Sequence, residues 1–139
     1  MRFILDTCVI SELVAKRPNP KVVEFIDSLD SDDVYLSVIA IGEITKGVEK
    51  LPGSKQKQEL YSWLKEDLLA RFYARVVPLD IDILMEWGLL IAHLESTGIT
   101  LPAIDSLISA TALTHKLTLV TRNADDFKDT GVEIVNPWA

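Results

Sequence analysis

Short apolar runs alternate along the chain with longer stretches whose apolar residues recur at helical spacing. The short runs, which are typical of buried strands, are 3–5, 34–36, 76–79, 117–121 and 132–135. Helical spacing covers 9–14, 20–29, 39–51, a segment carrying Leu60, Leu64 and Leu68, and then 82–95 and 103–115. This alternation predicts an α/β fold, in which a parallel sheet of about five strands is flanked by helices on both faces.

Polar residues mark where several of these helices begin. Asn19 followed by Pro20 is typical of a helix start, and Ser37 is placed to cap the helix after the second strand. We expect Asp82 to cap the helix after the third strand and Asp80 to close that strand. No repeat, linker or low-complexity tract interrupts the pattern, so we expect one domain over residues 1–139.

The composition is that of an ordinary globular protein, with 48% hydrophobic and 25% charged residues. No apolar run is long enough to span a membrane, and Asp6 follows only three apolar residues, too few for a secretory leader. The single cysteine, Cys8, fits a reducing compartment, so we expect a cytoplasmic protein. The net charge of -7 argues against a broad basic surface for nucleic acid, but an acidic enzyme can meet phosphates through bound cations.

Several common catalytic motifs are absent from the sequence. There is no G-x-G-x-x-G loop, no C-x-x-C pair, no H-E-x-x-H zinc motif and no G-x-S-x-G nucleophile elbow. The two histidines, His93 and His115, fall inside or at the end of predicted helices, where a structural role is expected. The remaining candidates for chemistry are the carboxylates.

Three carboxylates stand out by their surroundings. Asp6 follows the first strand, at the carboxyl edge where ligands bind in parallel sheets, although a helix-capping role explains it equally well. Glu43 lies among isoleucines, so we favour function over simple pairing with Lys46. Asp105 lies in a helix of small and apolar residues, where a charge needs a partner or a cation, although an acid also suits a helix N-terminus.

Further oxygen donors follow the fourth predicted strand, over 117–121, where Asn123, Asp125 and Asp126 form a polar turn. Three or four oxygen ligands without histidine or cysteine are typical of Mg²⁺ or Mn²⁺. Such ions activate water and stabilise the oxygens of a phosphodiester under attack. Among the basic residues near this edge, we favour Arg122 and Lys46 as phosphate contacts.

These residues lie in motifs that resemble those of a known family. The motifs are Ile4-Leu5-Asp6-Thr7, Glu43-Ile44-Thr45-Lys46-Gly47, Ala103-Ile104-Asp105 and Val120-Thr121-Arg122-Asn123. Together they resemble the PIN-domain proteins, and among these the VapC toxins, most closely those of the FitB type. The terminal Val135-Asn136-Pro137-Trp138 adds to the resemblance, which covers the whole chain.

The resemblance implies a PIN-like parallel sheet between helices and an endoribonuclease that depends on Mg²⁺ or Mn²⁺ and cleaves RNA with metal-activated water. The family's first three acidic positions match Asp6, Glu43 and Asp105. The fourth, often an aspartate, is Asn123 here, which leaves the role to its amide oxygen or to Asp126 or Asp125.

Other positions near the first aspartate and the fourth strand also follow from the resemblance. Cys8 replaces an asparagine that the family usually carries two residues after the first aspartate. The hydroxyls of Thr7 and Thr121 are expected to hold the ligands or a water of the site.

The resemblance further implies a cognate antitoxin, a small DNA-binding protein whose basic side chain suits the acidic pocket. We also expect a homodimer and no membrane association. The apolar faces of the helices before Leu36 and after Ile39 either accept the antitoxin or fill the core. Two other functions stay open: an inactive PIN-like binding module, which Asn123 favours, and an aspartyl phosphotransferase, which needs an aspartate where Cys8 stands.

Overall fold

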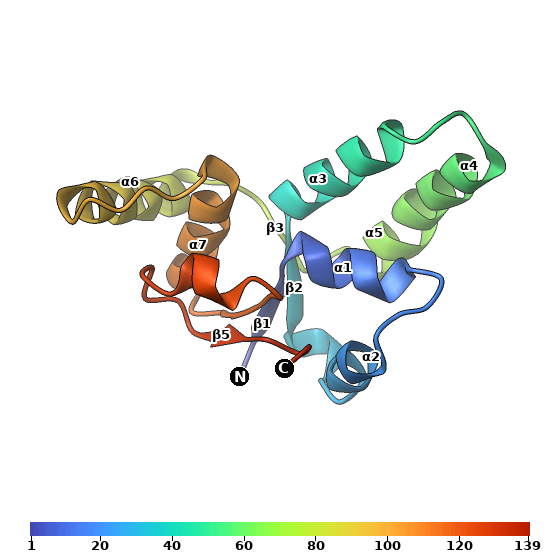
Figure 1. Ribbon diagram of the computed structural model, residues 1–139, viewed down its shortest axis with the longest axis horizontal. Coiled ribbons are helices and arrows are strands. Elements are labelled where there is room, and N and C mark those ends of the chain that lie inside the picture. The colour runs from blue at the N-terminus through green and yellow to red at the C-terminus, as the bar shows by residue number, and fades with distance from the viewer.

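The computed structural model describes residues 1–139 and contains a five-stranded parallel sheet in the order β3-β2-β1-β4-β5 (Figure 1). The strands are β1 (Phe3–Leu5), β2 (Val34–Ser37), β3 (Val76–Val77), β4 (Thr118–Val120) and β5 (Ile134–Val135). The strand β1 is central and pairs with both β2 and β4, whereas β3 and β5 form the two edges. The predicted α/β architecture, with its five parallel strands, is confirmed.

Helices cover both faces of this sheet. They are α1 (Thr7–Val14), α2 (Pro20–Asp27), α3 (Val38–Glu49), α4 (Lys55–Ser62), α5 (Leu69–Arg71), α6 (Ile81–Ser96) and α7 (Ala103–His115). Figure 1 shows α6 and α7 on one side of the sheet and α1 to α5 on the other. None of these helices combines the length and the apolar character needed to cross a membrane.

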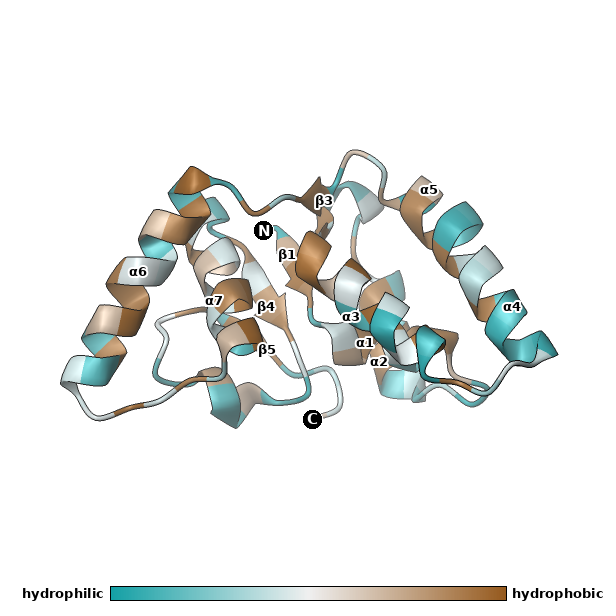
Figure 2. Cartoon of the chain, turned by 90° about the horizontal axis from the view of Figure 1, so that it is seen from above, coloured by the Kyte–Doolittle hydropathy of each residue, from teal (hydrophilic) through white to brown (hydrophobic).

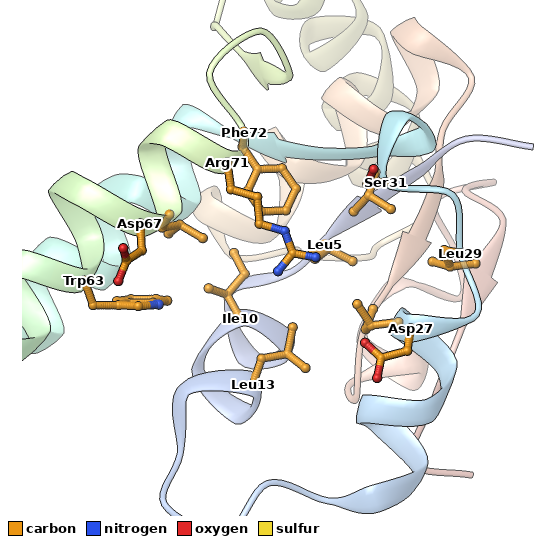
Figure 3. Close-up of a pocket in the computed structure, with 13 residues that line it drawn as sticks. Leu5, Ile10, Leu13, Asp27, Leu29, Ser31, Trp63, Asp67, Arg71 and Phe72 are labelled. Atoms are coloured by element: carbon orange, nitrogen blue, oxygen red, sulfur yellow. The ribbon is translucent and has the colours of Figure 1, made fainter.

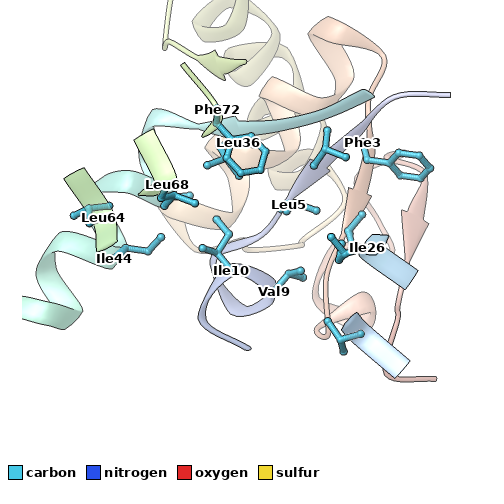
Figure 4. Packing of buried hydrophobic residues seen from close by; sticks show 14 of the residues in the cluster. Phe3, Leu5, Val9, Ile10, Ile26, Leu36, Ile44, Leu64, Leu68 and Phe72 are labelled. Carbon is cyan, nitrogen blue, oxygen red and sulfur yellow. The ribbon is translucent and has the colours of Figure 1, made fainter. Parts of the chain in front are cut away.

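The alternation of side chains along β1 divides the core into two parts. Phe3 and Leu5 point into a large cluster with α1, α2 and α3, whereas Ile4 points into a smaller cluster beneath α7. Figure 4 shows the larger cluster, in which Ile10 and Phe72 also lie. Because each fully buried aliphatic or aromatic side chain stabilises the fold by about 1.5–3 kcal/mol, both helical layers are held firmly to the central strand.

The apolar faces of α2 and α3 are taken up by the core. Val22 and Ile26 on α2, like Ile44 and Val48 on α3, are buried in the large cluster. Of the two uses expected for these faces, the structure therefore shows core packing for these four side chains.

The helix starts confirm two of the predicted caps and correct a third. The side chains of Asn19 and Ser37 accept hydrogen bonds from backbone N–H groups of the helices that follow them. The prediction for Asp82 was wrong: Asp80 is the cap, because its extended backbone lets Oδ1 accept from the N–H of Ile83 at 3.0 Å. Asp82 lies in the first turn of α6, where its charge complements the helix dipole.

Several boundaries differ from the predicted ones. The helix expected from Val9 begins at Thr7, because Asp6 caps it. The single helix expected around Leu60, Leu64 and Leu68 consists of α4, a π-helical stretch over Trp63–Leu68 and α5. The strands β3 and β5 are shorter than predicted, since only two residues of each pair with a neighbour.

Candidate active site

Asp6 lies at the carboxyl end of the central strand and is almost fully buried, with 7% of its surface exposed. Its Oδ1 accepts a hydrogen bond from the N–H of Thr7 at 2.8 Å, which makes it the cap of α1. Its Oδ2 accepts from the hydroxyl of Thr121, at the end of β4, also at 2.8 Å. The Cys8 thiol lies 3.8 Å from the same oxygen. Asp6 is therefore both a cap and a carboxylate oriented by the neighbouring strand.

Glu43 reaches the same edge from α3. Its Oε1 accepts a hydrogen bond from the Thr7 hydroxyl at 2.6 Å, and its Oε2 has no hydrogen bond within the protein. Thr7 thus contacts both carboxylates, Asp6 through its backbone and Glu43 through its side chain. The alternative in which Glu43 pairs with Lys46 is wrong, because no ion pair joins them.

Asp105 lies in the first turn of α7 and is half-buried. Its carboxylate makes no hydrogen bond or ion pair within the protein. Burial raises the pKa of Asp105 above its ordinary value, and the negative charges of Asp6, Asp126 and Glu43 raise it further. The structure thus brings together carboxylates from four separate segments of the chain.

The turn after β4 contributes further oxygen atoms. The backbone N–H of Asn123 donates to the Thr121 hydroxyl at 3.1 Å, while its exposed side-chain amide makes no hydrogen bond within the protein. The next residues form a short 3-10 helix over Ala124–Phe127, on which Asp125 and Asp126 are exposed. Both aspartates line one hollow together with Asp105.

The charge of this cluster is not neutralised by the protein. The three ion pairs of the structure, Lys55–Glu59, Lys57–Glu49 and Arg75–Asp32, all lie elsewhere. Lys46 and Arg122 are exposed and form no ion pair. Oxygen donors that carry excess negative charge are the chemical setting that attracts a hard divalent cation.

The donor set fits such a cation only with additional ligands. No three side chains of histidine, cysteine, aspartate or glutamate converge closely enough to hold a metal ion by themselves. This openness suits Mg²⁺, which is usually bound through one or two carboxylates and keeps several waters. Burial raises the pKa of the Cys8 thiol, so this sulfur is protonated at neutral pH and is not a thiolate ligand.

Neither histidine side chain makes a hydrogen bond or an ion pair with this cluster. His93 is exposed on α6, and His115 is the last residue of α7, where its carbonyl accepts from Arg2. Their predicted exclusion from the chemistry agrees with these positions.

An apolar groove, which the sequence analysis missed, lies on the face of the sheet that α1 and α2 cover. It encloses about 280 Å³, and its wall is shown in Figure 3. The lining residues come from β1, α1, the segment from α2 to β2 and the segment 63–72: Leu5, Ile10, Leu13, Ile26, Asp27, Leu29, Ser31, Val34, Trp63, Asp67, Leu68, Arg71 and Phe72. Trp63, a large aromatic residue next to the apolar positions Leu60 and Leu64, was the signal that could have revealed it.

Comparison with known proteins agrees with this arrangement. The PIN domain matches residues 3–133. The chain belongs to the PIN-domain family. Toxin FitB of Neisseria gonorrhoeae is 37% identical over 97% of this chain and 97% of its own length. The VapC ribonuclease Y4jK of Sinorhizobium fredii is 33% identical over 97% of this chain and 96% of its own length.

A solved structure extends the likeness to three dimensions. The structure of FitAB bound to an IR36 DNA fragment contains a chain that is similar at a TM-score of 0.94 and 35% identity, over 99% of this chain and 96% of that one. Ribonucleases with PIN domains generally depend on a divalent metal. Both the fold and the family expected from the sequence are therefore confirmed.

Proposed function

We propose that this protein is the toxin of a toxin–antitoxin pair and cleaves RNA as an endoribonuclease that depends on Mg²⁺ or Mn²⁺. The observation that carries the proposal is the gathering of carboxylates at the carboxyl edge of the sheet, where Thr7 joins Asp6 to Glu43 and Asp105 shares a hollow with Asp126, and no basic side chain forms an ion pair with any of them. The relatives named Toxin FitB and VapC ribonuclease support it. Such a cluster repels RNA by itself, so its use on RNA requires a cation.

Asp6 and Asp105 would hold the ion directly, Glu43 would hold it or position a water, and further waters would complete its shell. A bound divalent cation makes water a better nucleophile at neutral pH and neutralises charge on the phosphate. Thr121 and Thr7 fix the two oxygens of Asp6, so that this carboxylate is oriented before any ligand arrives. Thr7 also holds Oε1 of Glu43, which leaves Oε2 free to accept a proton or a ligand.

The fourth oxygen would come from Asn123 or from Asp126. Position after β4 favours Asn123, whose side-chain amide makes no hydrogen bond within the protein. The effect of Asp126 on the pKa of Asp105 supports Asp126. Calorimetric titration of Mn²⁺ separates the two, because Asn123→Asp adds a charge and tightens binding if residue 123 is the ligand. If Asp126 is the ligand, Asp126→Ala weakens binding instead.

The experiment that tests the function is cleavage of a fluorogenic single-stranded RNA. Activity should appear with Mg²⁺ or Mn²⁺, disappear with EDTA and return when the metal is added in excess. Asp105→Asn should abolish it, with the fold retained by circular dichroism. A protein that binds RNA but does not cut it under any of these conditions is the inactive binding module, which Asn123 favours. A phosphorylated Asp6 would instead indicate a phosphotransferase.

The groove of Figure 3 is our proposed docking site for the antitoxin. Its wall is mainly apolar, and Asp27, Asp67 and Arg71 supply charges among the lining side chains. An amphipathic segment with apolar anchors fits such a groove. A basic side chain continuing from that segment would enter the carboxylate cluster and pair with Asp6 or Asp105.

Antitoxin docking is tested with the protein encoded beside this gene. Leu29→Glu, which places a charge in the groove, should weaken the complex in a co-purification assay. Tyr73→Glu is the matched control, since Tyr73 is exposed and does not line the groove. In bacteria, expression of this chain alone should arrest growth, and co-expression of the antitoxin should relieve the arrest. If bacteria that express the wild-type chain grow as well as bacteria that express the Asp6→Ala form, at comparable protein levels, the toxin assignment is contradicted.

The homodimer would form along α6. Ile81, Met85 and Leu89 follow one another at a spacing of four residues and are exposed. Figure 2 shows hydrophobic positions, in brown, recurring along α6. Two copies packed through this stripe would remove it from water. Sedimentation should show dimers that Met85→Lys dissociates and that His93→Lys, on the same helix, leaves intact.

A further inference from the structure

The C-terminal tail brings Trp138 against Arg122, the residue that follows Thr121 of the site. The guanidinium carbon of Arg122 lies 5.4 Å from the centre of the Trp138 ring, within the range of a cation–π contact. Asn136 ties the two residues together, since its amide donates to the carbonyl of Arg122 at 3.3 Å and accepts from the N–H of Trp138 at 2.9 Å. Figure 1 shows the tail returning from β5 toward the middle of the molecule.

This arrangement holds the arginine side chain without neutralising it. Trp138 is half-buried and packs against the large core cluster, so the indole is anchored. Arg122 is exposed, and its guanidinium makes no ion pair although the chain carries 21 acidic residues. A planar cation that rests on a fixed ring keeps its N–H groups available to an external anion.

The position of the pair points to the anion. Arg122 directly follows Thr121, whose hydroxyl orients Asp6, and directly precedes Asn123, which donates to that hydroxyl. The pair therefore lies beside the carboxylate cluster, but Arg122 forms no ion pair with its carboxylates. An anion that must approach these carboxylates, such as a phosphodiester of RNA, meets this arginine at the margin of the site.

We propose that Arg122 binds a phosphate of the RNA strand next to the bond that is cleaved, and that Trp138 is the positioning residue that holds Arg122 for it. This inference rests on the proposed function. A guanidinium matches a phosphate with two parallel N–H···O bonds, and prior fixing by the indole reduces the ordering cost when the strand binds. The C-terminal tail is thus part of the substrate-binding surface.

The test measures binding of a labelled single-stranded RNA by fluorescence anisotropy, in an Asp105→Asn background that does not cut it, with Mg²⁺ present. Arg122→Gln should weaken binding about tenfold or more, the factor expected for a lost charge-assisted contact. It should also lower the slope of log affinity against log salt by about 0.7, since one phosphate contact is lost. A purely structural role does not change that slope.

Trp138→Leu tests the positioning role. It should weaken RNA binding by less than Arg122→Gln does, and Arg122→Gln should cost less in the Trp138→Leu background than in the parent. Trp138→Phe, which keeps an aromatic face, should recover part of the affinity. Additive losses for the two residues would overturn the positioning role of Trp138.

Arg2→Gln is the matched control, because Arg2 also lies over an aromatic ring, that of Tyr35, but at the opposite end of the strands. It removes the same charge and should leave RNA affinity unchanged. If the wild-type protein cleaves RNA in a metal-dependent manner, but Arg122→Gln in the Asp105→Asn background binds RNA as tightly as Asp105→Asn alone, only this inference is overturned. A parent that neither binds nor cuts RNA overturns the proposed function with it. If only antitoxin affinity falls in Arg122→Gln, the pair belongs to that interface and the RNA assignment is wrong.

Discussion

Two aspartates of this protein occupy the same local motif and have different surroundings. Asp6 follows β1 and caps α1, and Asp80 follows the segment of β3 and caps α6. Each accepts a backbone N–H through Oδ1, at 2.8 Å for Asp6 and 3.0 Å for Asp80. Yet Asp6 is buried among other polar side chains, whereas Asp80 is exposed and its carboxylate makes no further hydrogen bond.

The difference follows from their places in the sheet. The central β1 has β2 on one side and β4 on the other, so its end meets Thr121 directly and Glu43 through Thr7. The strand β3 is an edge and pairs with β2 alone. A strand, an aspartate and a helix therefore form a cap anywhere in this fold, and they form a site only where neighbouring strands deliver further side chains to the same place.

Replacement of the two aspartates by asparagine gives the largest expected contrast. Asp6→Asn should lower RNA cleavage by about 10²-fold or more, because a metal ligand charge worth several kcal/mol is lost. Asp80→Asn should cleave like the wild type, since asparagine is an equally good cap. Initial rates with Mn²⁺ measure both. Wild-type cleavage by Asp6→Asn would remove this carboxylate from the site.

The hydroxyl that distinguishes Asp6 from Asp80 is the next place to test. Thr121→Val keeps the shape of a fully buried side chain but removes the hydrogen bond to Oδ2 of Asp6. We expect cleavage to fall about 10-fold or more, the usual effect of losing a group that orients a metal ligand. Thr121→Ser should restore most of the rate.

Thr111→Val is the control for burial. Thr111 is also fully buried, but its hydroxyl bonds only to a carbonyl of its own helix. Its replacement should leave the rate unchanged. Equal losses in both variants would mean that the effect of Thr121 is on folding and not on Asp6.

The same contrast explains how far the sequence could be interpreted. Local chemistry was enough for the strand and helix order and for the caps at Asn19 and Ser37, because these depend on residues close in the chain. It failed between Asp80 and Asp82, where either residue can cap a helix and the choice depends on backbone angles. The π-helical stretch over Trp63–Leu68 has no clear local signature and was read as an ordinary helix.

Features that join distant parts of the chain were likewise predictable from the sequence only in part. The gathering of Asp6 and Asp105 at one edge follows from the rule for parallel sheets together with the family resemblance. The bond from Thr7 to Glu43 and the stacking of Arg122 on Trp138 depend on how separate segments pack, which no pattern in the chain expresses. The same is true of the apolar groove, whose wall comes from several segments that are distant in the chain.

Removal of the cap at Asp80 should affect stability and leave chemistry intact. Asp80→Ala loses the hydrogen bond to the N–H of Ile83. We expect about 1 kcal/mol less stability to unfolding, while Asp80→Asn stays close to the wild type. Urea unfolding followed by circular dichroism measures the difference, and the cleavage rate of the native protein should not change. A loss of activity without a loss of stability would show that the edge aspartate takes part in the site.

The smallest expected effect concerns Asp105, compared with Asp82, since both lie in the first turn of a helix. Burial and neighbouring carboxylates raise the pKa of Asp105 in the folded protein. Between the ordinary value for aspartate, about 3.9, and the raised one, the folded state holds more protons than the unfolded state. Stability therefore falls as pH increases through this window, and the deficit persists at higher pH.

Asp105→Asn cannot ionise and should lack this fall. In metal-free buffer at neutral pH it should be more stable than the wild type, by less than about 1 kcal/mol because solvent screens the half-exposed carboxyl. The gain should vanish below about pH 4, where aspartate is protonated in both states. Asp82→Asn should give no such gain, because the dipole of α6 stabilises the negative charge of Asp82. Thermal unfolding across this pH range measures all three proteins, and a gain for Asp105→Asn that is independent of pH would contradict the electrostatic explanation.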